Sequence, residues 1–388
     1  MVAGPRIRSG SHRQGRGRSP RTPVARMLRR TLRPLAWSAL LLGCLTGCVK
    51  SVDRVTIDRV FARAAVQPDL DRGCTVGLAL GSPVEAVTSA SRPPVRAVVV
   101  ADAAAALCAE DEVREAQLAS ARLEANLQQL APAAQIALIK DARAVEERAH
   151  ARAAARNLRA WEAMHEAWGP LGEERCPRIR EADEVAFLLG LNAGLNALLH
   201  DRATGGDLGV PLDTLLDIAR ASECLDDARW WYAPQAMRAA VWATVPGSGP
   251  EGVDAWALLD EAAAKGDAGG VRLARALQAV IASNNGRPDV VRHAVRAFAR
   301  SRAEVPPHPE YALFDDYAHV LVRHESDLLW TRAAGHRTLE LGALPGDEAR
   351  EATGGADEDP FAAAGDPFAA GDPFAAGTGD TTTEEDAP

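Results

Sequence analysis

The 388-residue sequence has none of the motifs that are typical of hydrolases or of nucleotide-binding enzymes. It contains no Gly-x-Ser-x-Gly segment, which would expose a nucleophilic serine, and no Gly-x-x-x-x-Gly-Lys-Ser/Thr loop, which would hold phosphates. His319 and His324 are five residues apart, whereas the histidine pair of a zinc protease is four apart with a glutamate between. We therefore expect no catalytic residue, no metal and no cofactor, and we predict that the protein is not an enzyme.

Aspartate and glutamate are absent from the first 47 residues, where arginine is frequent. The basic stretch is followed by an apolar run from Leu35 to Cys44, which at roughly 10 residues is too short to cross a bilayer but is typical of a signal peptide. The run ends in Leu45-Thr46-Gly47-Cys48, which resembles the lipobox of bacterial lipoproteins. The resemblance implies cleavage before Cys48 and lipid attachment to its thiol. We predict that residues 1–47 are a signal region, with Met27 as the true start.

Lipid on Cys48 would tether the protein to a membrane, because two or more acyl chains are enough for stable anchoring. Val49 follows the cysteine where aspartate would favour retention in the inner membrane. The resemblance therefore implies the periplasmic face of the bacterial outer membrane, with the inner membrane and the cell surface as alternatives.

Basic residues are scarce outside the signal region. The whole chain has a net charge of −9, but ten of its arginines lie in residues 1–47, so the rest carries 34 basic and 53 acidic residues and a net charge of −19. Such a surface favours solubility and disfavours nucleic acid or anionic lipid as a partner.

Only four cysteines would be free to pair in the mature protein, since Cys44 leaves with the signal and Cys48 takes the lipid. An even number in an oxidising compartment predicts two disulfides, with three connectivities open. We favour the pairs that each enclose a short stretch of chain, Cys74–Cys108 and Cys176–Cys224. No two of these cysteines have the spacing of a zinc knuckle or of a redox Cys-x-x-Cys.

Strand signals are almost absent as well. The best candidate, residues 75–81, is weakened by Gly77 and Gly81, and most of the remaining body is rich in the helix formers Ala, Leu, Arg and Glu. Two long helices are predicted over 95–130 and 132–168, where they would form an antiparallel hairpin. Shorter helices are predicted over 179–200, 211–221, 225–245, 251–265, 268–284, 288–303 and 309–334. This rhythm predicts an all-α fold, a TPR-like α-solenoid over residues 48–345 that begins with the long hairpin and has disordered termini.

Aromatic residues number only 18, so three in a row are a local concentration. They belong to a candidate ligand or partner groove made of Arg229, Trp230, Trp231, Tyr232, Arg238 and Trp242. Here an aromatic wall would lie beside an arginine that meets an anionic group. Ordinary packing between helices is the alternative, and it is favoured.

A second candidate for the groove is the segment 187–199, which is apolar nearly all round and should be a buried helix. Gly190 and Gly194 would let a neighbouring helix approach closely. Asn192 and Asn196 lie one turn apart on one face, and buried amides need partners, so they either link helices or point into a cavity. Packing is again favoured.

The C-terminal residues 346–388 lose the apolar periodicity of a helix and repeat Asp-Pro-Phe three times, at 359–361, 366–368 and 372–374. Proline, glycine and acids with so few apolar residues predict a disordered acidic tail. The repeats could act as weak docking sites strengthened by number, but repeat expansion without a function is the favoured interpretation.

Several features together resemble the T-component lipoproteins of TRAP-type transporters (the TatT-like family): the lipobox, the entry segment 107–110, the helical repeats and the stretch 236–254. The resemblance implies a TPR-like fold, oligomeric assembly, a periplasmic binding protein as partner and ligand handling without catalysis. We therefore predict an accessory component of solute uptake that binds a small ligand, a periplasmic protein or both. The alternative is an envelope assembly scaffold that binds polypeptides in a TPR-like groove.

Overall fold

The computed structural model describes residues 54–88, 95–126, 132–171 and 175–347, and within these ranges every regular element is a helix. The all-α prediction is confirmed. The signal region, Cys48 and the Asp-Pro-Phe repeats lie outside the described residues. The candidate strand at residues 75–81 is instead the middle of a helix. Gly77 is needed there because a Cβ would lie only 2.7 Å from the carbonyl oxygen of Ala101 on the neighbouring helix.

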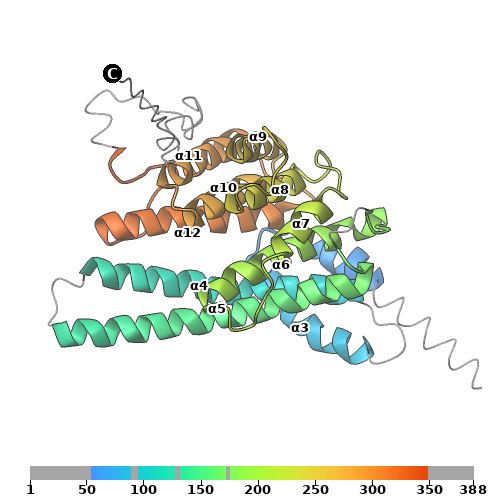
Figure 1. Ribbon diagram of the computed structural model, residues 1–388, viewed down its shortest axis with the longest axis horizontal. Coiled ribbons are helices and arrows are strands. Elements are labelled where there is room, and N and C mark those ends of the chain that lie inside the picture. Colours follow the sequence, from blue (N-terminus) through green and yellow to red (C-terminus); the bar gives the residue numbers. More distant parts are fainter. Residues whose placement is uncertain (1–53, 89–94, 127–131, 172–174, 348–388) are drawn as a thin grey trace, which may run out of the picture. The chain divides into compact units, whose positions relative to one another are not determined.

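The elements follow one another in chain order as η1 (Thr56–Phe61), α2 (Ala62–Ala65), α3 (Leu70–Thr88), α4 (Val95–Asn126), α5 (Pro132–Trp168), η3 (Glu181–Asp183), α6 (Glu184–Ala203), α7 (Thr214–Ser222), α8 (Ala233–Thr244), α9 (Ala255–Ala268), α10 (Leu273–Asn284), α11 (Pro288–Glu304) and α12 (Ala312–Ala334). Figure 1 shows α4 and α5 as the two longest helices, lying side by side.

The predicted long hairpin is present as α4 and α5. Pro132 is the first residue of α5, where its missing N–H costs no hydrogen bond, and Gly169 follows the helix with φ +86°. Helix α3 packs on α4, and a disulfide between Cys74 and Cys108 links the two with a Cα–Cα distance of 5.5 Å. The favoured pairing of these cysteines is therefore confirmed.

Helix α6 is the buried core helix that its composition predicts. Its two glycines face α5: a Cβ on Gly194 would lie 2.5 Å from the Trp161 ring, and one on Gly190 would collide with Met164. The close approach of a neighbouring helix is confirmed, and Trp161 is a packing residue in that contact. Among the described residues, the segment Glu181–Ala203 alone is long and apolar enough to cross a membrane, but it is mostly buried within the protein, as a core helix is.

The second disulfide, Cys176–Cys224, also has a Cα–Cα distance of 5.5 Å and links the segment before α6 to the end of α7. This confirms the other favoured pair. Helix α8, by contrast, begins at Ala233 and not near residue 225 as predicted. Trp231 and Tyr232 have φ values of 50° and 59°, which end any helical run at this point, and Pro234 in the first turn starts the new helix.

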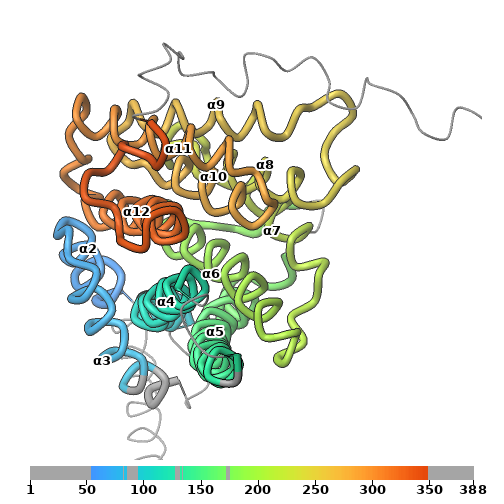
Figure 2. The backbone as a smooth tube through the Cα atoms, turned by 90° about the vertical axis from the view of Figure 1, so that its left-hand side faces the viewer, coloured from blue at the N-terminus to red at the C-terminus, as the bar shows by residue number. Residues whose placement is uncertain are grey.

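The later helices form a layer over the first ones. Helices α8, α10 and α12 contact one another in that order, and α12 then packs along α4 (Figure 2). Two layers of helices therefore enclose the space between them. The TPR-like solenoid is not confirmed by this arrangement and stays a prediction.

Candidate functional site

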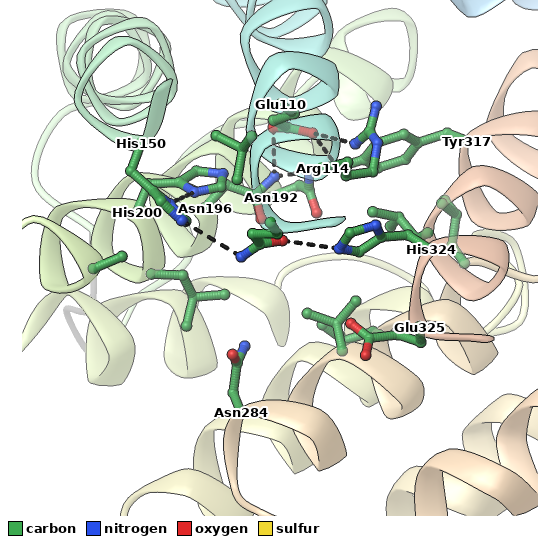
Figure 3. Close-up of a pocket in the computed structure, with 18 of the residues that line it drawn as sticks. Glu110, Arg114, His150, Asn192, Asn196, His200, Asn284, Tyr317, His324 and Glu325 are labelled. Atoms are coloured by element: carbon green, nitrogen blue, oxygen red, sulfur yellow. Dashed lines mark hydrogen bonds and ion pairs between the residues drawn. The ribbon is translucent and has the colours of Figure 1, made fainter. Parts of the chain in front are cut away.

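A cavity of about 310 Å³ lies between the two layers, where α4, α5 and α6 face α8, α10 and α12. Its size is at the lower end of the range of small-molecule sites. Apolar side chains of α6, α8, α10 and α12 form much of the wall. They include Leu188, Leu199, Met237, Leu273, Leu277 and Leu321. The remaining wall is unusually rich in hydrogen-bonding groups (Figure 3).

Helix α4 supplies one polar edge of the cavity. Glu110, Arg114 and Gln117 line it at intervals of four and three residues, which places them on one face of the helix. The carboxylate of Glu110 accepts hydrogen bonds from Asn196 Nδ2 at 3.0 Å, from Asn157 Nδ2 at 3.1 Å and from Tyr317 Oη at 2.8 Å. Three donors and the Arg114 guanidinium at 4.0 Å compensate the buried charge of Glu110.

Tyr317 joins this edge from α12 and is 9% exposed. Burial and the adjacent Glu110 carboxylate raise the pKa of the Tyr317 hydroxyl, so it stays protonated and remains a donor. Its hydroxyl also lies 3.3 Å from Asn196 Nδ2. Glu110, Asn196 and Tyr317 thus join three helices into one fixed corner of the cavity.

Three histidines continue the polar edge as a chain of hydrogen bonds. His324 Nε2 lies 2.8 Å from Gln117 Oε1, Gln117 Nε2 lies 3.5 Å from His150 Nε2, and His150 Nδ1 lies 2.9 Å from His200 Nδ1. Because the oxygen of Gln117 can only accept, His324 must carry its proton on Nε2. The Gln117 amide then donates to His150 Nε2, which leaves the His150 proton on Nδ1, where it is donated to His200.

All three histidines are held in the neutral form. Burial lowers the pKa of His200 to about 4 and that of His324 to about 3, and the Arg114 cation adds to the effect on His324. Burial also lowers the pKa of His150. The chain therefore has a fixed direction near pH 7, and the buried Nδ1 of His324 is an acceptor without a hydrogen-bond partner.

Glu325 lines the cavity from α12, and its surroundings differ from those of Glu110 on α4. It is 7% exposed and lines the cavity, as Asn284 does (Figure 3). Burial raises the pKa of Glu325 to about 7, while a hydrogen bond with the Ser283 side chain opposes that shift in part. The carboxyl group is therefore near the midpoint of its titration at neutral pH.

The two asparagines predicted for the groove do line this cavity. Asn196 holds Glu110 and Tyr317 as described, and Asn192 lies one turn before it on the same face of α6. The sequence left two alternatives for these amides, a link between helices or a place in a cavity wall. Both hold for Asn196.

The aromatic concentration has a different place in the structure. None of the six residues Arg229, Trp230, Trp231, Tyr232, Arg238 and Trp242 is among those that line the cavity. Trp230 and Trp231 are 3% and 7% exposed and lie edge to face at 5.5 Å. They pack in the core with Tyr311 and Phe314, as the favoured packing alternative has it.

The neighbours of these tryptophans are also engaged elsewhere. Arg229 pairs with Glu181 at 2.9 Å and Arg238 with Asp227 at 2.6 Å, so neither arginine awaits an anionic ligand. The Tyr232 ring lies under the Lys265 ammonium at 4.7 Å, and Trp242 packs against Gly249. Each of these contacts accounts for its residue by packing or pairing.

Most of the polar residues in the cavity were missed, and His324 was considered and set aside. The missed groups are Glu110, Arg114, Gln117, Glu146, His150, His200, Tyr317 and Glu325. A pattern in the sequence does mark them, because polar residues interrupt the apolar faces at helical spacing: 110, 114 and 117 on α4, and 192, 196 and 200 on α6. Interruptions of this kind on two faces that meet indicate a polar cavity.

Within the described part of the chain, no three His, Cys, Asp or Glu side chains are grouped so that they could bind a metal ion. The cavity wall also contains no serine, threonine, cysteine or lysine among its lining residues. What the site offers is hydrogen bonding, one titrating carboxyl group and an apolar wall.

No family model, curated protein or solved structure matches the chain. The resemblance to the T-component lipoproteins therefore stays a prediction.

Proposed function

We propose that the protein binds a small organic molecule in the cavity between its two helical layers and does so without catalysis. The observation that carries the proposal is the wall itself: apolar side chains from α6, α8 and α10 lie together with hydrogen-bonding groups from α4, α5, α6 and α12. Binding sites for small molecules have this composition, in which apolar contacts give affinity and a few fixed polar groups orient the ligand. A ligand with one apolar and one polar end fits this wall.

The polar part of the wall is better suited to recognition than to chemistry. Its histidines are linked to one another and held neutral, and the wall supplies no serine, threonine, cysteine or lysine nucleophile among its lining residues. Glu110 is held by three donors and an arginine, so its carboxylate is already engaged within the protein. These features favour a protein that binds and releases its ligand unchanged.

The lipobox at Cys48 places this binding activity at a membrane in our proposal, with the envelope of a bacterium as the compartment and the outer membrane as the destination. The two disulfides support an oxidising compartment. A tethered protein that retains a small molecule would act as an accessory component of solute uptake. A periplasmic binding protein is the partner that this role requires.

Native mass spectrometry of the full chain tests the proposal by comparing its native and denatured masses. We expect a bound small molecule on the wild type and its loss from Leu277→Trp, in which a larger side chain enters the cavity. Leu339→Trp is the matched control, because Leu339 is 87% exposed and the same change there should leave the ligand bound. Loss from both variants, or retention in both, would contradict the cavity as the site.

A further inference from the structure

A buried carboxyl group of the cavity, Glu325, points to the charge of the ligand. Buried ionisable groups are normally paired, because an isolated charge loses its hydration without recompense. In the described protein, Asp315 is 0% exposed and lies 2.8 Å from Arg272, while Asp201 is 1% exposed and accepts hydrogen bonds from the backbone N–H groups of Leu208 and Val210. Glu325 is 7% exposed, yet no Lys, Arg or His within the described ranges forms an ion pair with it.

We infer that the cavity takes organic cations, and that Glu325 holds the ammonium group of a small amine while the apolar wall takes its hydrocarbon part. The inference rests on the proposed function and names the class of ligand for that same site. Glu325 and Asn284 lie on the side of the cavity away from Glu110 and Arg114 (Figure 3), so the positive charge of Arg114 is separated from the ammonium position. Phe314 in the wall adds an aromatic ring, a group that also attracts cations.

Asn192 and Asn284 also line the cavity, and their amide groups offer oxygen acceptors as well as N–H donors. The three protons of an ammonium group need acceptors, and an anionic ligand would need donors. The strongly negative chain favours the cation, because its field concentrates cations near the surface.

The groups around Glu325 leave it as the one that titrates near neutral pH. Helix α10 presents the neutral Ser283 and Asn284, and α12 itself carries Arg332, whose charge lowers the pKa of Glu325 against the larger effect of burial. The other ionisable groups of the cavity come from α4, α5, α6 and α12 and comprise Glu110, Arg114, Glu146, His150, His200, Tyr317 and His324. The three histidines of the cavity have lowered pKa values and stay neutral above pH 6.5.

Binding of an amine would therefore displace one proton. The carboxylic acid of Glu325 loses its proton to solvent, the ligand keeps its ammonium proton, and the two charges pair in the cavity. Below the pKa of Glu325, near 7, the association constant should rise about tenfold per pH unit, and above it the dependence should level off.

Isothermal titration of the full chain tests the inference with three probes of similar shape: 2-phenylethylamine, 2-phenylethanol and phenylacetate. At pH 8 we expect the amine to bind at least tenfold more tightly than the alcohol, and phenylacetate to bind weakest. Glu325→Gln should weaken amine binding at least tenfold and abolish its pH dependence, with little effect on the alcohol. Glu304→Gln is the matched control, since it removes the same charge from an exposed position and should change nothing.

The outcomes separate the inference from the proposed function. Equal binding of amine and alcohol, or an amine affinity unchanged in Glu325→Gln, would overturn the cation inference while the cavity remains a binding site. Tighter binding of phenylacetate would overturn it as well. If the amine and the alcohol bind the wild type and Leu277→Trp equally, or bind neither, the cavity is not the site and both claims fall.

Discussion

Two regions of the protein bury polar groups, and they do so in opposite ways. Between α9, α10 and α12, Arg272 is completely buried with its guanidinium bonded to Asp315, Ser301 and the Val305 carbonyl oxygen. Arg275 is bonded to Asp260 and Asp267 in the same region. In the cavity, burial lowers the pKa values of the three histidines, and Glu325 forms no ion pair with any of the described residues.

The comparison separates structural polar groups from groups that are available to a ligand. In the first region the buried arginines meet carboxylates, so the network holds helices together. In the second, desolvation shifts pKa values toward the neutral forms because the protein supplies no full compensation. A bound ligand can supply the compensation that the protein lacks. The following changes should break or sharpen this contrast, in order of decreasing effect.

Arg272→Ala should have the largest effect. Removing the guanidinium leaves the Asp315 carboxylate buried without its partner, which typically costs about 3–5 kcal/mol of the free energy of unfolding. Urea unfolding followed by circular dichroism measures the loss. Arg287→Ala breaks an exposed pair with Asp289 and should cost less than about 1 kcal/mol. Similar losses in the two variants would contradict a structural role for the buried network.

Glu325→Gln should act in the opposite direction and stabilise the protein above pH 7 when no ligand is present. The pKa of this carboxyl group is raised from 4.5 to about 7 in the folded protein, so the folded state binds more protons than the unfolded state between these values. The stability of the wild type should therefore fall as pH rises from 4.5 to 7, by about 2–3 kcal/mol in total. Unfolding curves at pH 5 and pH 8 should show this trend in the wild type and lose it in the variant. A destabilised variant at pH 8 would argue that Glu325 is a paired structural carboxylate.

His324→Gln should remove a loss of about 2 kcal/mol in the free energy of unfolding that the wild type shows on acidification. Burial depresses the pKa of His324 to about 3, so below pH 6.5 the unfolded state binds a proton at this histidine and the folded state does not. The free energy of unfolding therefore falls as pH falls. Relative to the wild type, the variant should gain stability between pH 6.5 and pH 4.5. The difference between the two proteins is the quantity to measure, because Glu325 contributes the opposite trend in both. No change in that difference with pH would mean that His324 is charged or exposed.

Trp230→Phe should have the smallest effect. Its indole Nε1 donates to Glu184 at 3.0 Å, and loss of that hydrogen bond should cost about 1 kcal/mol while the ring packing is kept. Retention of a ligand in native mass spectrometry should be unchanged. Loss of the ligand from this variant would contradict the cavity as the binding site and would favour the predicted aromatic groove.

The sequence alone predicts the helical fold well because the evidence for it is local. The helix formers, Pro132 at the start of α5 and the glycines of α6 each act within one element or on its nearest neighbour. The disulfide pairs were predictable for the same reason. The start of α8 was predicted too early because the positive φ values at Trp231 and Tyr232 are set by tertiary packing of their rings.

The cavity was only partly predictable because it depends on which helix faces meet. Asn192 and Asn196 were recognised from one helix, but Glu110 and Tyr317 are 207 residues apart and meet only when α12 packs on α4. The tryptophans were prominent by composition, yet a run of large aromatic residues fills a core as well as it forms a binding site. Interruptions of an apolar face by polar residues are the better guide here.

Nitrogen-15 NMR of the histidine side chains tests the central claim most directly, using the full chain with labelled histidine and one His→Gln variant for each assignment. At pH 7, before and after 2-phenylethylamine is added, we predict neutral rings for His150, His200 and His324. His150 should carry its proton on Nδ1 and His324 on Nε2, and both His324 and His200 should shift when the amine binds. Rings that titrate near pH 6.5 and do not respond to any of the three probes would contradict a preformed, neutral binding cavity.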